Sequence, residues 1–439
     1  MNQLQLINEL IELDQNHFLH PTSSIKQQQE EGPAAIFTEG KGIYVTDLSG
    51  KTYIEGMSSL WNVHVGYGRK ELAETARAQM EKLAFSNCFS TFSNEPAIRL
   101  AKKIADMTPG DLQAVFFTSG GSEANDTAYK LAQYYWKLKG FPNKTKIISR
   151  KQAYHGLAVG STSATGISAF HTMTPSPSPE FIHIDPFSAE ELEQVIQQEG
   201  EEHIAAFIAE PVQGAGGVHI PPPDYLENVR KICDKYNVLM IADEVITGFG
   251  RTGKMFACEH WNVVPDFMLF AKGVTSGYMP LGGVVIRQPI HEDLKELAKG
   301  TLLHGFTYSG HPVSCAVGLH NIDIIEEEKL VENSRTAGEE MKYHLQQIQD
   351  EIPYVGDVRS LGLIGGLEIM KNPETNERFT EKISPLIVKE ARNRGLILRN
   401  VVFEEADTIV FAPPLIIQGE EIMTLFSILK DSILAVLNH

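Results

Sequence analysis

The sequence predicts an α/β protein in which helices cover both faces of a mainly parallel β-sheet. From about Gly68 to Pro312, helical segments alternate with short, nearly continuous apolar runs of strand length. Parallel strands buried on both faces read as such runs, because neither face meets water. With 439 residues, of which 42% are hydrophobic, the chain can bury a substantial core and form two domains.

The N-terminal part is predicted to contain one helix and one hairpin. Residues 1–15 carry Leu4, Ile7 and Leu10 at helical spacing, which is typical of an amphipathic helix. The runs 43–45 and 52–54 flank a turn at Ser49–Gly50, as expected for two paired strands.

The central part supplies the predicted sheet, and the C-terminal part is predicted to be α+β. The expected strands are 114–117, 146–149, 204–209, 238–242 and 267–271. The expected helices are 123–135, a long helical region over 314–350, and a final helix over 420–437.

Charge and composition exclude several classes of protein. The net charge of −18 argues against nucleic acid or an anionic membrane as a partner. No stretch approaches the roughly 18 apolar residues of a membrane span, and residues 1–15 do not resemble a secretory signal. The four cysteines are widely scattered and lack metal-ligand spacing, so no metal site is expected. We therefore expect a cytoplasmic protein.

Two buried runs end in side chains that can perform chemistry. Lys272 follows the run 267–271, and Asp243 follows the run 238–242. In open α/β sheets, ligands bind at the carboxyl ends of strands. A desolvated amine there can form a Schiff base, and a carboxylate can keep a pyridine ring protonated, so the pair suggests pyridoxal phosphate (PLP). Two simpler interpretations remain open: a lysine reaching towards water, and an aspartate capping the next helix.

A glycine turn supplies a candidate phosphate site. The expected strand 114–117 is followed by the turn 118–122, which contains Gly120, Gly121 and Ser122, and then by a helix. Free backbone N–H groups and the helix dipole favour an anion at such a position. The pattern is neither a P-loop nor a dinucleotide fingerprint, and alone it is weak, because many such turns are ordinary loops.

At this point the chain resembles a known family, the fold-type I, class III PLP-dependent aminotransferases, and within it the ω-amino acid and amine:pyruvate subgroup. The matching blocks occur in order along nearly the whole chain, at residues 119–126, 154–156, 210–214, 242–253, 265–283, 305–312 and 412–415.

The resemblance implies an architecture and an assembly. A large PLP-binding domain with a mainly parallel seven-stranded sheet would span residues 68–313. Residues 1–67 and 314–439 would form a smaller α+β domain. The active unit would be a homodimer or a larger assembly, because in the family the stretch matching Phe306–Thr307 reaches the phosphate of the partner's cofactor.

The resemblance also assigns roles to residues around the cofactor. Lys272 and Asp243 would be catalytic, Lys272 as the Schiff-base lysine and general acid/base and Asp243 as the partner of the pyridinium nitrogen. Val245, two positions after Asp243 along an extended backbone, would press on one face of the ring, and Tyr154 would stack on the other. The remaining cofactor contacts would be Gly121, Ser122, His155 and Thr307. For Tyr154 and His155, ordinary structural roles remain open.

The substrate pocket rests on the subgroup resemblance. The residues expected to line the amine pocket are Leu60, Trp61, Phe89, Tyr154 and Ala215, with Ser86 leaving it roomier than in relatives that carry an aromatic there. Arg399 resembles the mobile arginine that pairs with the substrate carboxylate, a task that suits a guanidinium. A short insertion after Arg399 puts its reach in doubt, and Glu404 or Glu405 could compete for it. Trp61 as plain core and Arg399 as a solvated side chain stay open.

The predicted function is ping-pong transamination from an ω-amino acid or amine donor to pyruvate. A 2-oxoglutarate-using or biotin-pathway enzyme of the same class is an alternative. So is an aminomutase, racemase or decarboxylase on the same scaffold, and a non-catalytic binding protein is a third class. Taurine, β-alanine, a diamine and an arylalkylamine are all possible donors, and the sequence does not choose among them.

Overall fold

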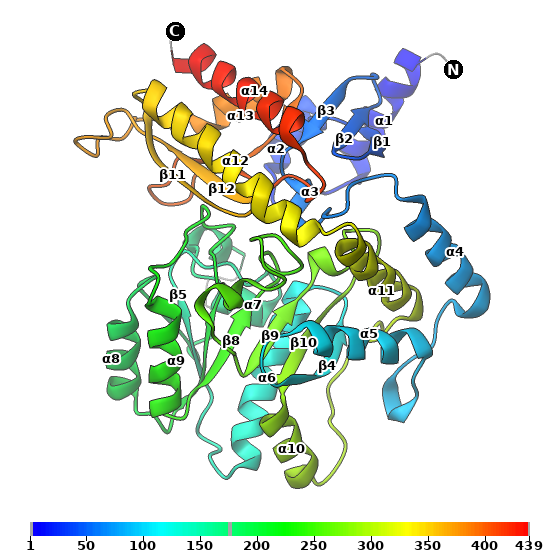
Figure 1. Ribbon diagram of the computed structural model, residues 1–439, viewed down its shortest axis with the longest axis vertical. Coiled ribbons are helices and arrows are strands. Elements are labelled where there is room, and N and C mark those ends of the chain that lie inside the picture. The colour runs from blue at the N-terminus through cyan, green and yellow to red at the C-terminus, as the bar shows by residue number, and fades with distance from the viewer. Residues whose placement is uncertain (1–2, 174–177, 438–439) are drawn as a thin grey trace.

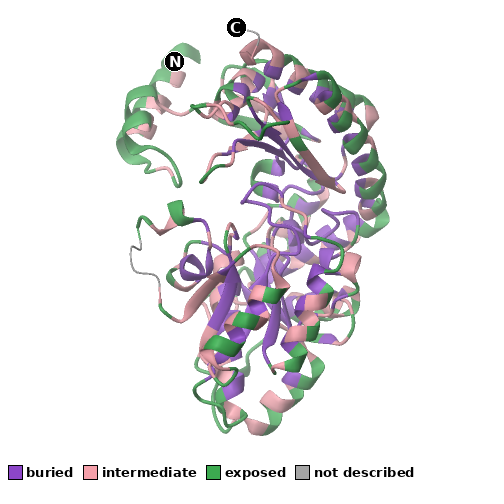
Figure 2. Cartoon of the chain, turned by 90° about the vertical axis from the view of Figure 1, so that its left-hand side faces the viewer, coloured by how far each residue is buried: buried purple, intermediate pink, exposed green. Residues whose placement is uncertain are grey.

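The computed structural model describes residues 3–173 and 178–437. Figure 1 shows two bodies, one above the other, with both chain ends in the upper body. The lower body is built around a seven-stranded sheet, and the upper body contains two four-stranded sheets. Figure 2 shows that the strands of the lower body consist mainly of buried residues, while α1 at the N-terminal end is largely exposed.

The central sheet confirms the predicted class. In spatial order its strands are β4 (Leu112–Thr118), β10 (Gly282–Arg287), β9 (Phe267–Phe270), β8 (Leu239–Asp243), β7 (Ile204–Ala209), β5 (Lys146–Arg150) and β6 (Phe181–Ile184). β10 runs antiparallel to both of its neighbours, and the other adjacent pairs are parallel. The sheet is therefore mixed but mainly parallel, as the alternation of helices and apolar runs predicts.

Both faces of this sheet are covered by helices, which explains the continuous apolar runs. In β9, Phe267 and Leu269 pack in the apolar cluster that contains α6, whereas Met268 and Phe270 pack in the cluster that contains α5. α6 (Gly121–Leu138) and α10 (Gln288–Leu297) cover one face; α5 (Glu95–Met107), α8 (Ala189–Glu199) and α9 (Tyr225–Lys235) cover the other. Every residue of β9 is buried, because successive side chains point to opposite covered faces.

The upper body joins the two ends of the chain. The predicted hairpin is present as β2 (Tyr44–Asp47) and β3 (Thr52–Glu55), with β1 (Phe37–Lys41) beside β2. β3 also pairs in parallel with β13 (Leu396–Ile397) from the C-terminal part. The second sheet has the order β11 (Val355–Leu361), β12 (Ile364–Ile369), β15 (Thr408–Phe411) and β14 (Arg399–Val401).

The helical region predicted over 314–350 is two helices. α11 (Pro312–Glu327) and α12 (Leu330–Glu351) are separated by Glu328 and Lys329, and the φ angle of 53° at Lys329 breaks the helical path. α11 packs against α4 (Lys70–Leu83) and α5 of the lower body. α11 thus begins before residue 314, and the boundaries after residues 67 and 313 remain a prediction.

The remaining helices complete the two bodies. They are α1 (Gln3–His17), α2 (Ile25–Glu31), α3 (Ser58–Trp61), α7 (Val159–Ala164), α13 (Ser384–Asn393) and α14 (Gly419–Leu437). Among the described residues, no helix combines the length and the apolar character needed to cross a membrane.

Candidate active site

The two chemical side chains singled out in the sequence lie together at one edge of the central sheet. Asp243 is the last residue of β8, and Lys272 comes two residues after the end of the neighbouring strand β9. The strands are parallel, with Asp243 opposite Leu269, so both deliver their following residues to the same edge. This is the position at which open α/β sheets bind ligands.

Lys272 and Asp243 share a cavity of about 110 Å³. The cavity is lined by Gly121, Ser122, Asn125, Tyr154, His155, Gly156, Glu210, Asp243, Val245, Ile246 and Lys272. With the exception of Thr307, every residue expected to bind the cofactor belongs to this set. The lining combines a glycine turn, a half-buried amine, two carboxylates and two aromatic rings, which is the donor set that PLP requires.

The environment of Lys272 favours a neutral amine. Desolvation lowers the pKa of Lys272, and the guanidinium of Arg399 lowers it further, while the carboxylates of Asp243 and Glu210 oppose the shift. No hydrogen bond to Nζ of Lys272 is found within the described part of the chain. The amine is therefore available as a nucleophile and as a proton acceptor.

Asp243 is held in one orientation by three neighbours. Its Oδ2 accepts a hydrogen bond from Nδ2 of Asn125 at 3.0 Å and lies 2.8 Å from Nδ1 of His155. Its Oδ1 accepts from the backbone N–H of Val245 at 3.1 Å. The side chain of Asp243 is almost completely buried, as is that of His155. A carboxylate fixed in this way can present a constant charge to a ring nitrogen.

The start of α6 forms the expected anion cradle. α6 begins at Gly121, and the first N–H groups of a helix have no partner within the helix. A Cβ on Gly121 would lie 2.9 Å from Cγ1 of Val245, and a Cβ on Gly156 would lie 2.3 Å from Oγ of Ser122. Gly156 also has a φ angle of 115°, so glycine is required there for two independent reasons. The cradle is thus kept open by residues without side chains.

Val245 reaches the cavity by a different route from the one expected. β8 ends at Asp243 and Val245 lies in a turn, so the backbone is not extended between them. The alternation argument was therefore wrong, because it applies only within a strand. Val245 lines the cavity nevertheless, since the turn folds its side chain back towards Gly121.

Arg399 lies beside the cavity in spite of the insertion that follows it. It is the first residue of β14, where it pairs with Val410 of β15. Its guanidinium stands 5.0 Å from the centre of the Trp61 ring, and desolvation lowers its pKa. Neither Glu404 nor Glu405 forms an ion pair with Arg399, whose guanidinium has no carboxylate partner among the residues described. The cation remains free for a substrate carboxylate.

An apolar wall beside Arg399 is built from residues of both bodies. Trp61 and Ala215 belong to one buried cluster, against which Tyr154 and Phe403 pack. The rings of Tyr154 and Phe170 lie 5.4 Å apart, and those of Phe170 and Phe403 lie 5.1 Å apart. The segment inserted after Arg399 therefore contributes an aromatic ring to this wall.

Six predicted residues do not line the cavity within a single chain. Trp61, Ala215 and Arg399 lie in or against the apolar cluster beside it, whereas Leu60, Phe89 and Thr307 are exposed. Leu60 and Phe89 are about half exposed, at 55% and 48%, and Thr307 is exposed. Phe89 lines a separate groove of about 850 Å³, and a Cβ on Gly305 would lie 2.9 Å from Cζ of Phe89. Their roles remain predictions.

Sequence reasoning missed Glu210 and Asn125. Glu210 directly follows β7 (Ile204–Ala209), which is the same signal that identified Asp243. Its carboxylate accepts from the backbone N–H groups of Tyr154 at 3.0 Å and Gly214 at 3.1 Å, and burial raises its pKa to about 6. Asn125 lies four residues after Gly121 on the same helical face, which could have indicated it.

Comparisons with known proteins agree with this geometry. The profile of the family described as Aminotransferase class-III matches residues 25–433. The putrescine–pyruvate aminotransferase of Pseudomonas aeruginosa is 43% identical over 439 residues, which cover 95% of this chain and 94% of that protein.

Solved structures show the same likeness. A transaminase from the marine bacterium Virgibacillus has 55% sequence identity and a TM-score of 0.96, covering 98% of this chain and 99% of that one. A thermostable (S)-enantioselective ω-transaminase from Thermomicrobium roseum has 44% identity and a TM-score of 0.93, with the same coverage. The fold is thus that of the fold-type I PLP-dependent transferases, and the chain belongs to the class III aminotransferases.

Proposed function

We propose that this enzyme transfers an amino group from an amine or ω-amino acid to pyruvate by a ping-pong mechanism that depends on PLP. The observation that carries the proposal is the half-buried Lys272, which lines one cavity with Asp243 and the Gly121 cradle. The similarity to a putrescine–pyruvate aminotransferase and to an ω-transaminase supports both the donor class and the acceptor.

The cavity fits PLP by its chemistry. The N-terminus of α6 with Gly121 and Ser122 would hold the phosphate, Asp243 would face the ring nitrogen, and Lys272 would meet the aldehyde carbon. Tyr154 and Val245, which both line the cavity, would contact the ring faces. When bound, PLP accepts electron density from the carbon that loses its proton, which is the chemistry a transaminase needs.

The protein residues have separate tasks in this scheme. Lys272 would bind the cofactor covalently and would move a proton from the donor carbon, which requires an amine that is neutral near physiological pH. Asp243 would hold the proton on the ring nitrogen. Asn125 and His155 hold that carboxylate in place by the hydrogen bonds to Oδ2.

One guanidinium suits an acceptor with one carboxylate. Pyruvate carries a single carboxylate, whose desolvation must be offset by a cation, and Arg399 is free to supply it. 2-Oxoglutarate has a second carboxylate, which would need a further cation. The similarity to a putrescine–pyruvate aminotransferase supports pyruvate as the acceptor.

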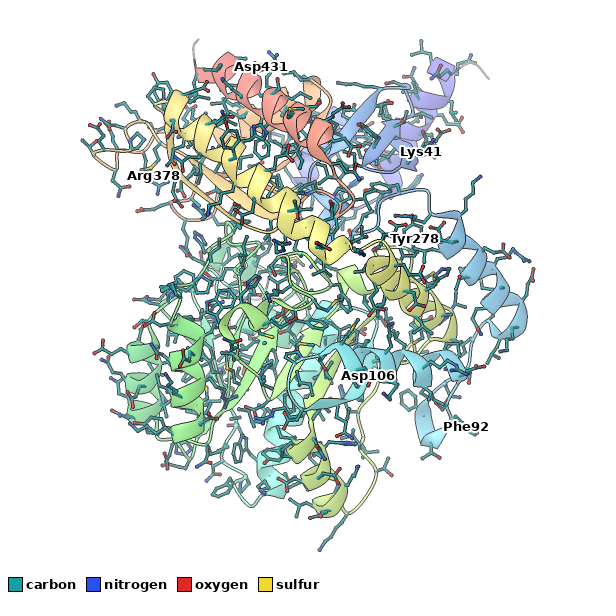
Figure 3. The ribbon with its side chains drawn as sticks, in the orientation of Figure 1. Lys41, Phe92, Asp106, Tyr278, Arg378 and Asp431 are labelled. Atoms are coloured by element: carbon teal, nitrogen blue, oxygen red, sulfur yellow. The ribbon has the colours of Figure 1, made fainter. Side chains whose placement is uncertain are left out.

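A second copy of the chain would complete the site. The 850 Å³ groove holds Phe89 and Leu303, and Leu303 is 90% exposed. Phe92, labelled in Figure 3 on the loop between α4 and α5, is 66% exposed. Such a concentration of exposed apolar side chains is typical of an interface. In a homodimer, Phe89 and Thr307 would contribute their side chains to the active site of the partner subunit.

A panel of donors and two acceptors tests the proposal. Putrescine, β-alanine, taurine and 1-phenylethylamine would each be paired with pyruvate or 2-oxoglutarate, and alanine and glutamate would be quantified. Alanine should form with at least one donor, and glutamate should form much more slowly. Faster formation of glutamate would overturn the choice of acceptor. Conversion of a single substrate without a keto acid would indicate a mutase, racemase or decarboxylase.

A further inference from the structure

The turn that carries Trp61 has a strained backbone. Ser58, Ser59 and Trp61 have φ angles of 45°, 60° and 58°, in the left-handed region that favours glycine. Non-glycine residues persist there only where the surrounding structure imposes the conformation. Three such residues within four positions require a specific restraint.

Glu55, the last residue of β3, supplies this restraint. Its Oε1 accepts a hydrogen bond from the backbone N–H of Met57 at 3.1 Å, and its Oε2 accepts from the backbone N–H of Ser59. The hydroxyl of Tyr67 approaches Oε2 at 3.4 Å. Glu55 is only 3% exposed, so these bonds act without competition from water.

A buried arginine supports the turn from the other side. Nη2 of Arg251 donates to Oγ of Ser58 at 3.0 Å, and that hydroxyl donates to the carbonyl of Ala412 at 2.7 Å. Arg251 is completely buried, and its charge and that of Glu55 attract each other. Glu55 and Arg251 therefore hold successive residues of one turn.

The position of the Trp61 ring depends on this turn. The ring is 3% exposed and lies under the guanidinium of Arg399 at 5.0 Å. Its Nε1 has no hydrogen-bond partner among the described residues, so no polar contact fixes the ring itself. The backbone conformation of residues 57–61 therefore determines the position of the Trp61 ring and of the Arg399 guanidinium that lies over it.

We propose that Glu55 is a positioning residue of the substrate pocket, which holds the turn 57–61 so that Trp61 supports Arg399 against the substrate. This inference rests on the proposed function for its kinetic consequence, but its structural consequence is independent of any substrate.

The groups around Glu55 set its pKa and therefore the pH at which its role should be tested. Burial raises the pKa of Glu55 to about 7, while the N–H groups of Met57 and Ser59, the hydroxyl of Tyr67 and the charge of Arg251 oppose the shift. His64 also faces Arg251, and Tyr278 faces Tyr67; burial lowers the pKa of His64 and raises that of Tyr278. At pH 8 the ionised carboxylate accepts both backbone N–H groups.

The decisive variant is Glu55→Gln in the holoenzyme at pH 8. An amide retains one acceptor oxygen and turns an NH₂ group towards one of the two backbone N–H donors, so the turn should relax. Glu55→Asp keeps both oxygens on a shorter side chain and should be affected less. Asp266→Asn is the matched control, because Asp266 is a buried carboxylate that accepts from the backbone N–H of Met240 and from Arg230 at the opposite end of β9.

Tryptophan emission is the first readout and needs no substrate. The chain has three tryptophans, so the signal of Trp61 is obtained by subtracting the emission of the matching Trp61→Phe protein. Glu55→Gln should shift the Trp61 emission, and Asp266→Asn should leave it unchanged. Kinetics are the second readout: the Michaelis constant for pyruvate should rise about tenfold in Glu55→Gln, with kcat changed less.

Each outcome bears on the proposal. Unchanged Trp61 emission and an unchanged Michaelis constant in Glu55→Gln would overturn it, as would equal effects in Asp266→Asn. If Glu55→Gln does not fold, Glu55→Asp must shift the Trp61 emission and raise the Michaelis constant, or the proposal fails. An emission shift in an enzyme that does not use pyruvate would support the role of Glu55 and count against the proposed acceptor.

Discussion

The cofactor side and the substrate side of the site are built in different ways. Asp243 ends a regular strand of the central sheet, and Lys272 follows its neighbour by two residues. Trp61 lies on a strained turn of the upper body, and Arg399 begins the short strand β14 of a separate sheet. Asp243 is fixed by strand pairing, whereas Trp61 is fixed by a few side-chain anchors to its turn.

This difference indicates how the two sides respond to change. A strand end in a sheet covered on both faces is held by many contacts, so substitution there removes chemistry while the fold persists. A turn held by one carboxylate and one guanidinium can shift when either is altered. We therefore expect large effects on rate from the cofactor side, and smaller effects on binding and stability from the substrate side.

The largest effect is expected for Lys272→Ala. Without the amine, no group in the cavity can bind the cofactor covalently and transfer the proton, so turnover should fall to background. Alanine formation by the purified variant measures this. Lys254→Ala, which removes an exposed lysine, is the control and should remain active. Transamination at a normal rate by Lys272→Ala would show that another group does this work.

Asp243→Asn should fold and lose most of its activity. A neutral amide cannot hold the proton on the ring nitrogen, and an electrostatic partner of this kind contributes roughly 3–5 kcal/mol, or about a hundred- to several thousand-fold in kcat. Circular dichroism would verify the fold, and kcat would be compared with that of Asp266→Asn. A loss below about tenfold would mean that Asp243 does not face the ring nitrogen.

Arg399→Ala separates the two half-reactions. Losing a charge-assisted bidentate bond costs on the order of 2–3 kcal/mol, so the Michaelis constant for pyruvate should rise about thirty- to a hundredfold. The half-reaction with an uncharged arylalkylamine should change little. Stopped-flow measurement of each half gives the comparison, with Arg399→Lys as the charge-conserving control. An equal loss of rate in both half-reactions would assign Arg399 a structural role.

The smallest expected effect concerns pH and Glu55. Its pKa is raised by burial from 4.5 to about 7, so the folded state retains a proton that the unfolded state has released. The stability gained from this group is fully present below pH 4.5 and is lost as pH rises through 7. The difference in unfolding free energy between the wild type and Glu55→Gln should therefore fall over this range, by on the order of 3 kcal/mol.

Denaturant unfolding at several pH values measures that difference. Asp266→Asn serves as the control, because it leaves Glu55 in place and should keep the wild-type dependence between pH 4.5 and 7. A difference between the wild type and Glu55→Gln that stays constant with pH would show that Glu55 does not titrate in this window.

Prediction from sequence was most successful where local pattern and long-range structure agree. The apolar runs before Asp243 and Lys272 are buried on both faces, so their composition alone identifies strands and their ends. Glu210 follows the apolar strand 204–209 in the same way. The prediction for Val245 failed in one respect, because side chains alternate between the two faces only within a strand and β8 ends at Asp243.

The sequence by itself determined the class of fold, the positions of the amine, the carboxylate and the glycine cradle, and the family. These follow from periodicity, strand ends and ordered motifs, which are local properties. Only the tertiary structure decided that Arg399 stands over Trp61 and that Glu55 holds the strained turn beneath them. The contact of Arg399 with Trp61 and that of Arg251 with Ser58 join residues far apart in the chain. The bonds from Glu55 are local, but they depend on a burial that the pairing of β3 with β13 creates, and no local pattern encodes either.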